Sequence, residues 1–407
     1  MVRFVHVSDT HLCRTYPSAE RVEAFNTAFK QVIDKAIDEK VDFILHSGDL
    51  FDKLHPWPNV VAFVKKQLKR LSEANIDFVV VRGNHDGSYD SEGIVRGCSI
   101  DLLYYPGLSN LILLDPLSRD GMVKEIGDVR LIGLGYYGHE TSKYFKNYVL
   151  RHFSKDKKNI LILHIFVDGY TSPPPGQPSL PLTYLENLNV DYIALGHEHN
   201  RFKVKRLESG AVVNNPGSIE KFDFLESDEK GFYIVELESE PKLEWIPIQS
   251  SHAMKLIKVE AEEPVKPSWF VEQALSKLKE VVRENKGKKL FIRIQMKGML
   301  SSGLPSDIKL SAIYDEFERL KRDGLLAYGD IIPPDVEIQL QELKLTSEGV
   351  DVRSFFKDAL GESLGEKLYK FYMKVREAYA DDDSLTRDGN LKKEVKARLV
   401  KDLLEGL

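Results

Sequence analysis

The sequence predicts a layered α/β fold, followed by a smaller α/β unit and a helical C-terminal segment. Short apolar runs rich in β-branched residues end in Gly, Asp, Asn or His, which is typical of a strand that leads into a functional loop. Helical patterns separate the first of these runs. At 407 residues the chain also exceeds the usual size of a single hydrophobic core, so we expect one large unit and further smaller ones.

The first half of the chain alternates strand and helix. Strands are expected at 2–7, 41–45 and 76–81, with helices at 19–38 and 60–74 between them. Three more strands should lead into Gly135, His164 and Gly196, and the later runs 211–213 and 231–236 follow with little helix between them. This pattern predicts that the first domain covers residues 1–250.

After residue 250 the pattern changes. Strands at 254–259 and 290–295 alternate with helices at 268–284 and 307–322, which predicts a small α/β domain over 251–346. The segment 350–407 has only helical periodicity, with apolar stripes. The first two stripes hold Phe355, Phe356, Leu360, Leu368, Phe371, Tyr372 and Val375, and the last helix holds Val395, Leu399 and Leu403. Because so short a unit buries little by itself, its stripes need another surface. That surface is a partner protein or the chain's own second domain.

The composition is that of an ordinary globular protein, with 42% apolar and 29% charged residues. No apolar run approaches the roughly 18 residues of a membrane span, and the first residues lack the features of a signal peptide. Two cysteines, Cys13 and Cys98, are too few for a disulfide framework and fit a reducing compartment. We therefore expect a cytoplasmic protein without membrane association. The net charge of −6 means that any nucleic-acid contact must use a local basic surface.

Seven potential metal ligands lie at or just past the carboxyl ends of predicted strands, where neighbouring loops of one sheet edge converge. They are Asp9, His11, Asp49, Asn84, His164, His197 and His199. A mixture of carboxylate, amide and imidazole favours Mn, Fe or Zn, because a pure Mg or Ca site rarely uses this much histidine.

The histidines are concentrated in these motifs. Residues i and i+2 of an extended chain face the same side, so His197 and His199 can reach one site, as can Asp9 and His11. His6 and His46 lie within predicted strands, and we interpret them as structural.

The motifs in their order resemble those of calcineurin-like metallophosphoesterases. They are Asp9-Thr10-His11, Gly48-Asp49, Gly83-Asn84-His85-Asp86, His164 and Gly196-His197-Glu198-His199. Two further motifs resemble those of the archaeal members of one family, the meiotic-recombination-eleven and SbcD family of DNA double-strand break repair nucleases. They are His46-Ser47-Gly48-Asp49-Leu50-Phe51 and Asn215-Pro216-Gly217-Ser218-Ile219-Glu220. The resemblance implies an αββα metallophosphoesterase domain, a small α/β capping domain and C-terminal helices.

The resemblance also implies how the ligands divide between two Mn ions per chain. Asp9, His11, Asp49 and His199 would hold one ion, and Asp49, Asn84, His164 and His197 would hold the other. His85 would lie beside the scissile phosphate, although a structural hydrogen bond is the alternative.

Asp52 is the second candidate catalytic residue, because it stands where many members of the family have a histidine. A carboxylate cannot replace an imidazolium beside a phosphodiester, so nuclease efficiency or polarity is in question, and His55 on the same loop could compensate. Near the motifs, the candidate phosphate contacts are Arg14, Lys53, Arg82, Arg201 and Lys221, and for each of them an ordinary surface charge is the alternative.

The expected activity is Mn-dependent double-strand exonuclease and single-strand endonuclease cleavage at DNA double-strand breaks. By resemblance, an SMC-like coiled-coil ATPase would bind the C-terminal helices, and a homodimer would form through 60–71 and 100–105. Two alternatives remain at the level of sequence: hydrolysis of small phosphodiesters or nucleotides, and a DNA-bridging scaffold with weak catalysis.

Overall fold

The computed structural model describes residues 2–89, 95–238 and 240–338, together with seven isolated positions between 353 and 373. The chain divides into two compact units, Met1–Ile338 and Gln339–Leu407. The apolar stripes predicted between Phe355 and Leu403 lie outside the described residues, so they remain predictions.

The first sheet has six strands in the order β16-β15-β1-β2-β3-β6. Its strands are β1 (Val2–Val7), β2 (Phe43–His46), β3 (Asp77–Val80), β6 (Leu111–Leu113), β15 (Gly231–Leu237) and β16 (Pro241–Pro247). Strands β1, β2, β3 and β6 are parallel to one another, whereas β15 pairs antiparallel with β1 and β16 pairs antiparallel with β15. The carboxyl ends of four strands therefore meet at one edge of the sheet.

The second sheet repeats this arrangement in the order β13-β14-β12-β9-β8-β7. Its strands are β7 (Val123–Ile126), β8 (Val129–Leu134), β9 (Lys158–His164), β12 (Tyr192–Gly196), β13 (Lys205–Arg206) and β14 (Val212–Asn214). The four central strands β14, β12, β9 and β8 are parallel, and β13 and β7 are antiparallel edges.

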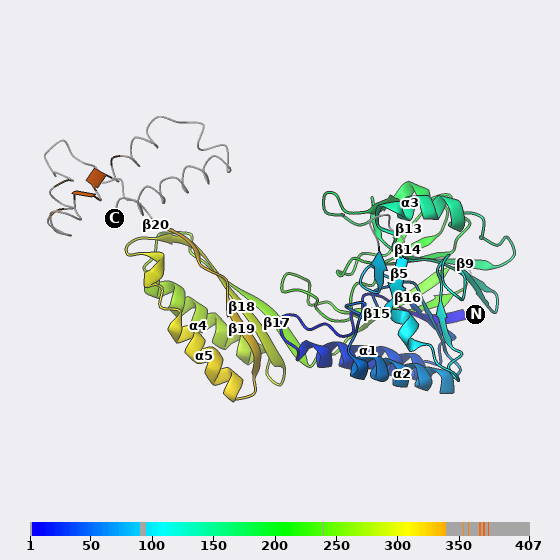
Figure 1. Ribbon diagram of the computed structural model, residues 1–407, viewed down its shortest axis with the longest axis horizontal. Coiled ribbons are helices and arrows are strands. Elements are labelled where there is room, and N and C mark those ends of the chain that lie inside the picture. The colour runs from blue at the N-terminus through cyan, green and yellow to red at the C-terminus, as the bar shows by residue number, and fades with distance from the viewer. Residues whose placement is uncertain are drawn as a thin grey trace. The chain divides into compact units, whose positions relative to one another are not determined.

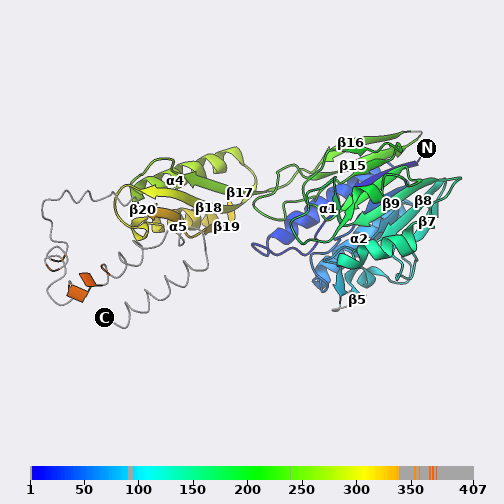
Figure 2. The ribbon, with the colours of Figure 1, turned by 90° about the horizontal axis from the view of Figure 1, so that it is seen from above.

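Three hydrophobic clusters fill the spaces between four layers (Figures 1 and 2). Helices α1 (Arg21–Asp38) and α2 (Pro58–Glu73) pack on the first sheet, and a cluster that includes Phe4 and Ile162 joins the two sheets. The short α3 (Thr141–Tyr144) and the helical turn Phe145–Val149 pack on the second sheet. The predicted αββα fold is confirmed.

Both long helices follow from their sequences. In α1 the buried positions Phe25, Phe29, Val32 and Ala36 recur every three or four residues and form one apolar face. Helix α2 begins with Pro58 in its first turn, where the missing N–H leaves no helical hydrogen bond unmade.

A third sheet follows at residue 252, with the order β17-β18-β19 and β20 paired to β18. Its strands are β17 (His252–Glu260), β18 (Lys289–Leu300), β19 (Leu326–Ile331) and β20 (Asp335–Ile338). Helices α4 (Pro267–Glu284) and α5 (Ser311–Arg322) lie side by side on it and share its apolar cluster (Figure 1). The helix expected from residue 307 begins only at Ser311, because a 3-10 turn, Pro305–Asp307, precedes it.

Two smaller strand pairs complete the described fold. The pair β10 (Phe166–Asp168) and β11 (Ser179–Pro181) follows His164, and β4 (Gly87–Tyr89) pairs with β5 (Val95–Cys98). Among the described residues, no helix has the length and apolar character needed to cross a membrane.

Candidate metal centre

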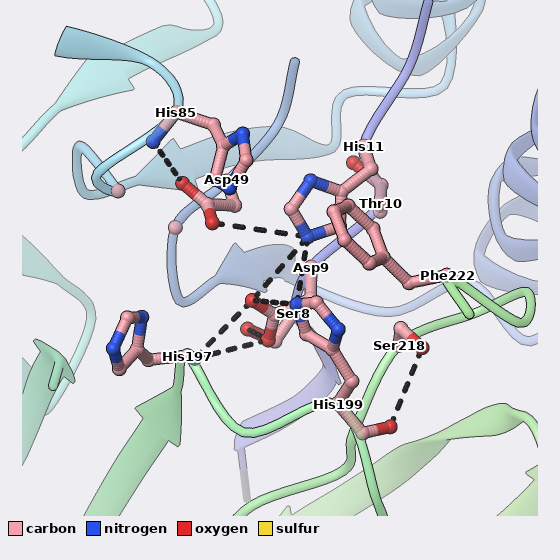
Figure 3. Close-up of polar contacts among 12 residues, drawn as sticks. Ser8, Asp9, Thr10, His11, Asp49, His85, His197, His199, Ser218 and Phe222 are labelled. Atoms are coloured by element: carbon pink, nitrogen blue, oxygen red, sulfur yellow. Dashed lines mark hydrogen bonds and ion pairs between the residues drawn. The ribbon is translucent and has the colours of Figure 1, made fainter. Parts of the chain in front are cut away.

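All seven predicted ligands lie together where the parallel strands of both large sheets end. Figure 3 shows five of them, Asp9, His11, Asp49, His197 and His199. Asp9 and His11 follow β1, Asp49 follows β2, and Asn84 follows β3. His164 is the last residue of β9, and His197 and His199 follow β12. The fold thus brings together residues up to 190 positions apart in the chain. We call this place the crest; it consists of the loops that follow β1, β2, β3, β9 and β12 at the carboxyl ends of both sheets.

The backbone at this crest is unusual. Asp9, His11, Asp49 and His197 have φ values of 51°, 38°, 56° and 87°, a region that residues other than glycine rarely adopt. Such conformations persist where the surroundings fix them, and they cluster at functional sites. Each of these turns directs a side chain into the common centre immediately after a buried strand.

Two glycines make the close packing possible. A Cβ on Gly83 would lie 2.0 Å from Asp49 Oδ1, and a Cβ on Gly48 would lie 2.2 Å from His164 Nδ1. Gly48 also has a φ of 100°, which only glycine adopts without strain. Both positions require glycine because the backbone passes directly against a ligand side chain.

The first group of donors consists of Asp9, His11 and His199. The Nε2 atoms of the two histidines are 3.0 Å apart, and each is 3.9 Å from Asp9 Oδ1. Asp9 is fully buried and accepts hydrogen bonds from the Ser8 hydroxyl and from the backbone N–H of His197. Burial raises the pKa of Asp9.

The second group consists of Asp49, His164 and His197, with Asn84 beside them. His164 Nε2 lies 3.3 Å from Asp49 Oδ2 and 3.1 Å from Asn84 Oδ1. Asp49 Oδ2 is also 3.7 Å from His11 Nε2, so this carboxylate stands between the two groups. The other oxygen of Asp49 accepts the backbone N–H of His85 at 2.8 Å.

The donor set fits cations, because hydrogen bonds fix which ring nitrogen carries a proton. His164 Nδ1 lies 2.7 Å from the carbonyl oxygen of Ser47, and a carbonyl can only accept. In the neutral ring, Nε2 therefore presents a lone pair, and it faces two oxygen acceptors, on Asp49 and Asn84. Lone pairs converging on one point repel each other unless a positive charge lies between them.

His199 repeats this arrangement. Its Nδ1 lies 2.8 Å from Glu226 Oε1, so the neutral ring presents the lone pair of Nε2 to His11 Nε2, only 3.0 Å away. His197 Nε2 is buried and has no hydrogen-bond partner among the described residues. These orientations fit transition metals, for which imidazole nitrogen is a preferred ligand.

The pKa shifts of His164, Asp49 and His197 also indicate a site that stabilises positive charge. Burial opposes a charged ring, yet the neighbouring Asp49 raises the pKa of His164 to about 9. Burial also opposes ionisation of Asp49, but His164 and His11 hold its pKa below the ordinary value. Burial and the charge of His164 lower the pKa of His197 to about 3, so that this ring is neutral and can act as a ligand.

The two candidate catalytic residues lie beside His11. His85 Nδ1 is 2.9 Å from the backbone carbonyl oxygen of Asp52, so Nδ1–H donates and Nε2 remains for another partner. Asp52 Oδ1 is 3.2 Å from Arg14 Nη1, 3.6 Å from His11 Nδ1 and 4.0 Å from His85 Nδ1. Burial raises the pKa of Asp52. His55 is exposed and belongs to none of the candidate ligand groups among the described residues.

Buried polar side chains support the loops from below. His6 bonds to Tyr192 and Ser47, and His46 bonds to Thr10, so both histidines are structural as predicted. Burial lowers the pKa of each to about 3. Asp86 accepts the backbone N–H groups of Leu50, Phe51 and Gly83 and thereby joins the loops that follow β2 and β3.

Several residues of the centre were missed by sequence reasoning. Phe222 packs against His11 and His199, with ring centroids 4.5 Å apart in both cases. The ring centroids of Phe166 and His197 are 4.3 Å apart. Tyr136 lies two residues past the end of β8, and its ring centroid is 5.4 Å from that of His197. Aromatic residues in loops are too common for their positions to indicate these contacts, and no spacing pattern connects them to the motifs.

The candidate phosphate contacts differ in how far their side chains are buried. Arg82 is 3% exposed and pairs with Asp115 at 3.2 Å, so the prediction that it contacts phosphate is wrong. Lys221 is 9% exposed and pairs with Asp228. Arg14 is 15% exposed, and its guanidinium carbon lies 3.4 Å from the centroid of Phe222. Lys53 and Arg201 are more accessible and stack on Trp57 and Trp245, respectively.

Comparison with known proteins agrees with this geometry. The family model of calcineurin-like phosphoesterases matches residues 2–201. A DNA double-strand break repair protein Mre11 from Sulfurisphaera tokodaii is 32% identical over 243 residues, which cover 58% of this chain and 59% of that protein. The match thus spans less than two thirds of that relative.

Longer matches reach beyond the phosphoesterase domain. The Mre11 protein of Sulfolobus acidocaldarius is 28% identical over 334 residues, covering 79% of this chain and 81% of that protein. The Mre11 protein of Thermoplasma acidophilum is 25% identical over 386 residues, covering 91% and 92%. With the clustered donor side chains, these matches support a metal-dependent phosphoesterase domain. Residues 2–201 thus form a calcineurin-like phosphoesterase domain, and the chain is similar to the archaeal Mre11 DNA double-strand break repair proteins.

Proposed function

We propose that this chain is a manganese-dependent nuclease that cleaves DNA at double-strand breaks. The observation that carries the proposal is the convergence of two donor groups on Asp49, in a chain whose relatives are DNA double-strand break repair proteins. A shared carboxylate between two groups of imidazole and oxygen donors is what a pair of cations needs to lie close together.

In this proposal Asp9, His11, Asp49 and His199 hold one cation, and Asp49, Asn84, His164 and His197 hold the other. Bound cations of this kind lower the pKa of water from 15.7 to about 7 and stabilise the attacking and leaving oxygens of an in-line displacement. The protein contributes the geometry: Ser47 and Glu226 fix the rings of His164 and His199, and His85 N–H fixes Asp49. Manganese suits this mixture of oxygen and nitrogen donors.

His85 is proposed to act on the leaving oxygen of the phosphodiester. Its Nδ1–H is held by the carbonyl oxygen of Asp52, and its side chain is 31% exposed. In its protonated form, the ring keeps this hydrogen bond and offers Nε2–H to a substrate oxygen. A proton delivered in this way contributes about 10²- to 10⁴-fold to such reactions.

Asp52 has a supporting role in this proposal. Its backbone carbonyl orients His85, and its carboxylate pairs with Arg14 at 3.2 Å. The pair neutralises a negative charge that would otherwise repel the substrate phosphate. The proposed contacts to the DNA backbone are Arg14, Lys53 and Arg201. These contacts are local, as the net charge of −6 requires.

The proposed partners follow from the family. We propose that an SMC-like coiled-coil ATPase binds the apolar stripes of segment 350–407 and that two copies of the chain pair through 60–71 and 100–105. The second contact rests on the resemblance to the family.

A direct substrate comparison tests the proposed activity. The purified chain is incubated with linear duplex DNA and, separately, with a small chromogenic phosphodiester, each with and without Mn(II). We expect Mn-dependent degradation of the duplex. Cleavage of the small diester alone would contradict the DNA substrate and would favour an enzyme acting on small phosphodiesters or nucleotides.

A further inference from the structure

The 220–230 loop, between β14 and β15, lies against only part of the metal centre. The ring of Phe222 contacts His11 and His199 at 4.5 Å and His85 at 5.8 Å (Figure 3). Within the described part of the chain, the ring and hydrogen-bond contacts of this loop reach neither His164 nor His197. The loop is therefore associated with the donor group of Asp9, His11 and His199.

Behind His199 the loop carries a buried ion pair. Glu226 Oε1 accepts the Nδ1–H of His199 at 2.8 Å, and Oε2 accepts Lys230 Nζ at 2.8 Å and the N–H of Phe222 at 2.9 Å. The Glu226 and Lys230 side chains are only 10% and 5% exposed. Lys230 also donates to the carbonyl oxygen of His199 at 2.9 Å and to Ser218 Oγ at 2.8 Å.

This network places donors on both oxygens of the Glu226 carboxylate, with His199 at Oε1 and both Lys230 and the N–H of Phe222 at Oε2. A carboxylate paired with Lys230 can only accept, so Nδ1 of His199 carries the proton in this hydrogen bond. The lone pair of Nε2 then points toward Asp9 and His11. Carboxylates behind metal-binding histidines raise ligand basicity in this way.

The far side of the loop is anchored to the third sheet. Phe224 is 4% exposed and forms a small cluster with Met254 and Phe291, and Asp228 pairs with Lys255 and Lys221. The same short loop thus contacts β17 and β18 on one side and a metal ligand on the other. Displacement of Phe224 would move the backbone that carries Glu226.

We propose that Glu226 is a positioning residue for one of the two cations: it fixes His199 for the site with Asp9 and His11, and the third sheet holds it in place through Phe224. The inference rests on the proposed function only in taking the centre to bind two cations. It predicts that the two cation sites differ in their dependence on this loop.

Manganese titration of the full chain tests this inference. Metal-stripped protein is titrated with Mn(II), and free Mn(II) is followed by electron paramagnetic resonance. We expect two sites in the wild type. Glu226→Gln keeps the size of the side chain but removes its charge and lets an amide N–H face Nδ1. It should weaken one site by about 10- to 100-fold and leave the other within about twofold.

Two further variants complete the test. Glu229→Gln is the matched control, because Glu229 is on the same loop and its side chain is 72% exposed. Its ion pair with Arg201 is long, at 3.7 Å. It should leave both sites unchanged. Phe224→Leu should weaken the same site as Glu226→Gln, to a smaller degree. Circular dichroism of each variant checks that the fold is retained.

Two results would overturn the inference. In one, Glu226→Gln binds two Mn(II) ions with wild-type affinity; in the other, both sites weaken equally, which is the outcome of a merely structural role. If Glu226→Gln fails to fold, Phe224→Leu decides alone by the same criterion. Failure of the wild type to cleave DNA would refute the proposed substrate but would leave the binding result unaffected.

Discussion

The rings of His164 and His199 in the candidate metal centre are oriented by the same kind of hydrogen bond. In each ring Nδ1–H donates to a fixed acceptor, the carbonyl of Ser47 or the carboxylate of Glu226. The opposite nitrogen is thereby available to a cation without reorganisation. His85 is held similarly by the carbonyl of Asp52, but its ring is partly exposed and therefore suits a role toward substrate.

Replacing His85 by glutamine should separate catalysis from metal binding. We expect His85→Gln to lower the turnover of DNA cleavage by about 100-fold or more, because the proton donor to the leaving oxygen is lost. Mn(II) binding should be unchanged, since the proposed ligand set does not include this ring. Steady-state kinetics and a metal titration of the same preparation measure both effects.

His55→Gln is the control for this prediction. His55 is exposed and lies three residues beyond Asp52, so its loss should leave turnover within about twofold. A comparable loss in His55→Gln would support the compensating role considered from the sequence. Wild-type turnover in His85→Gln would contradict the assignment of His85.

The convergence of the seven proposed ligands could be predicted from the sequence because each lies at or just past the end of a strand whose apolar pattern is clear. Glu226 could not, since it reaches His199 across 27 residues through an irregular loop. Arg82 was misassigned for a related reason. Its position next to Gly83-Asn84-His85 is right, but the sequence does not reveal that its side chain turns inward to Asp115.

At the scale of elements, the crest depends on how closely the loops after β2, β3 and β9 approach one another. Gly48 lies against His164, and Gly83 lies against Asp49, each at a distance that excludes a side chain. The three loops are thus parts of one packed structure. A small shift of one loop backbone should therefore displace proposed ligand side chains that follow other strands.

A single methyl group at Gly83 should therefore disrupt the centre. Its Cβ would lie 2.0 Å from Asp49 Oδ1 and 2.3 Å from the Asp49 backbone nitrogen, so one of the two loops must shift. A displacement of about 1 Å can lower activity by roughly 100-fold, and we expect a loss of this size in Gly83→Ala. Turnover and Mn(II) affinity should fall together.

Gly97→Ala offers the comparison. Among the residues that the structure describes, a Cβ there would meet only Leu54 Cδ1, at an ordinary 3.7 Å, so activity and affinity should remain at wild-type levels. Equal activity of the two alanine variants would mean that the close approach of Gly83 to Asp49 does not matter.

Elements with strong patterns were predicted closely, and those at sheet edges were not. Strand β1 and helices α1, α2 and α4 begin and end within two residues of their predicted limits. Strand β16 was missed because it is an edge strand with mostly half-exposed or exposed residues and a proline at each end. In β19 only the two terminal residues are buried, so no alternation marks it as a strand.

At the scale of the whole molecule, the chain combines a phosphoesterase domain with segments that supply none of the seven proposed ligands. The match to the Mre11 protein of Thermoplasma acidophilum covers 91% of the chain, well beyond the residues of the phosphoesterase domain. The predicted domains 1–250, 251–346 and 350–407 give these segments separate roles. Only the last lies almost entirely outside the described residues, and its role therefore depends on experiment.

Removal of the residues after Val352 should separate partner binding from catalysis. We expect the shortened chain to lose capture of the SMC-like ATPase in a pulldown, because the apolar stripes around Phe355 and Phe371 are removed. Mn-dependent cleavage of a small chromogenic phosphodiester should persist, since none of the seven ligands lies in this segment. Unchanged capture of the ATPase would contradict the docking role.

The proposed activity requires two cations, held around Asp49, for cleavage of a phosphodiester of DNA. The most direct test measures bound Mn(II) and cleavage of linear duplex DNA in the same metal-stripped sample as Mn(II) is added. We expect two ions per chain at saturation, with cleavage appearing only as the second ion binds. Full cleavage in the stripped protein, or with one ion bound per chain, would contradict it.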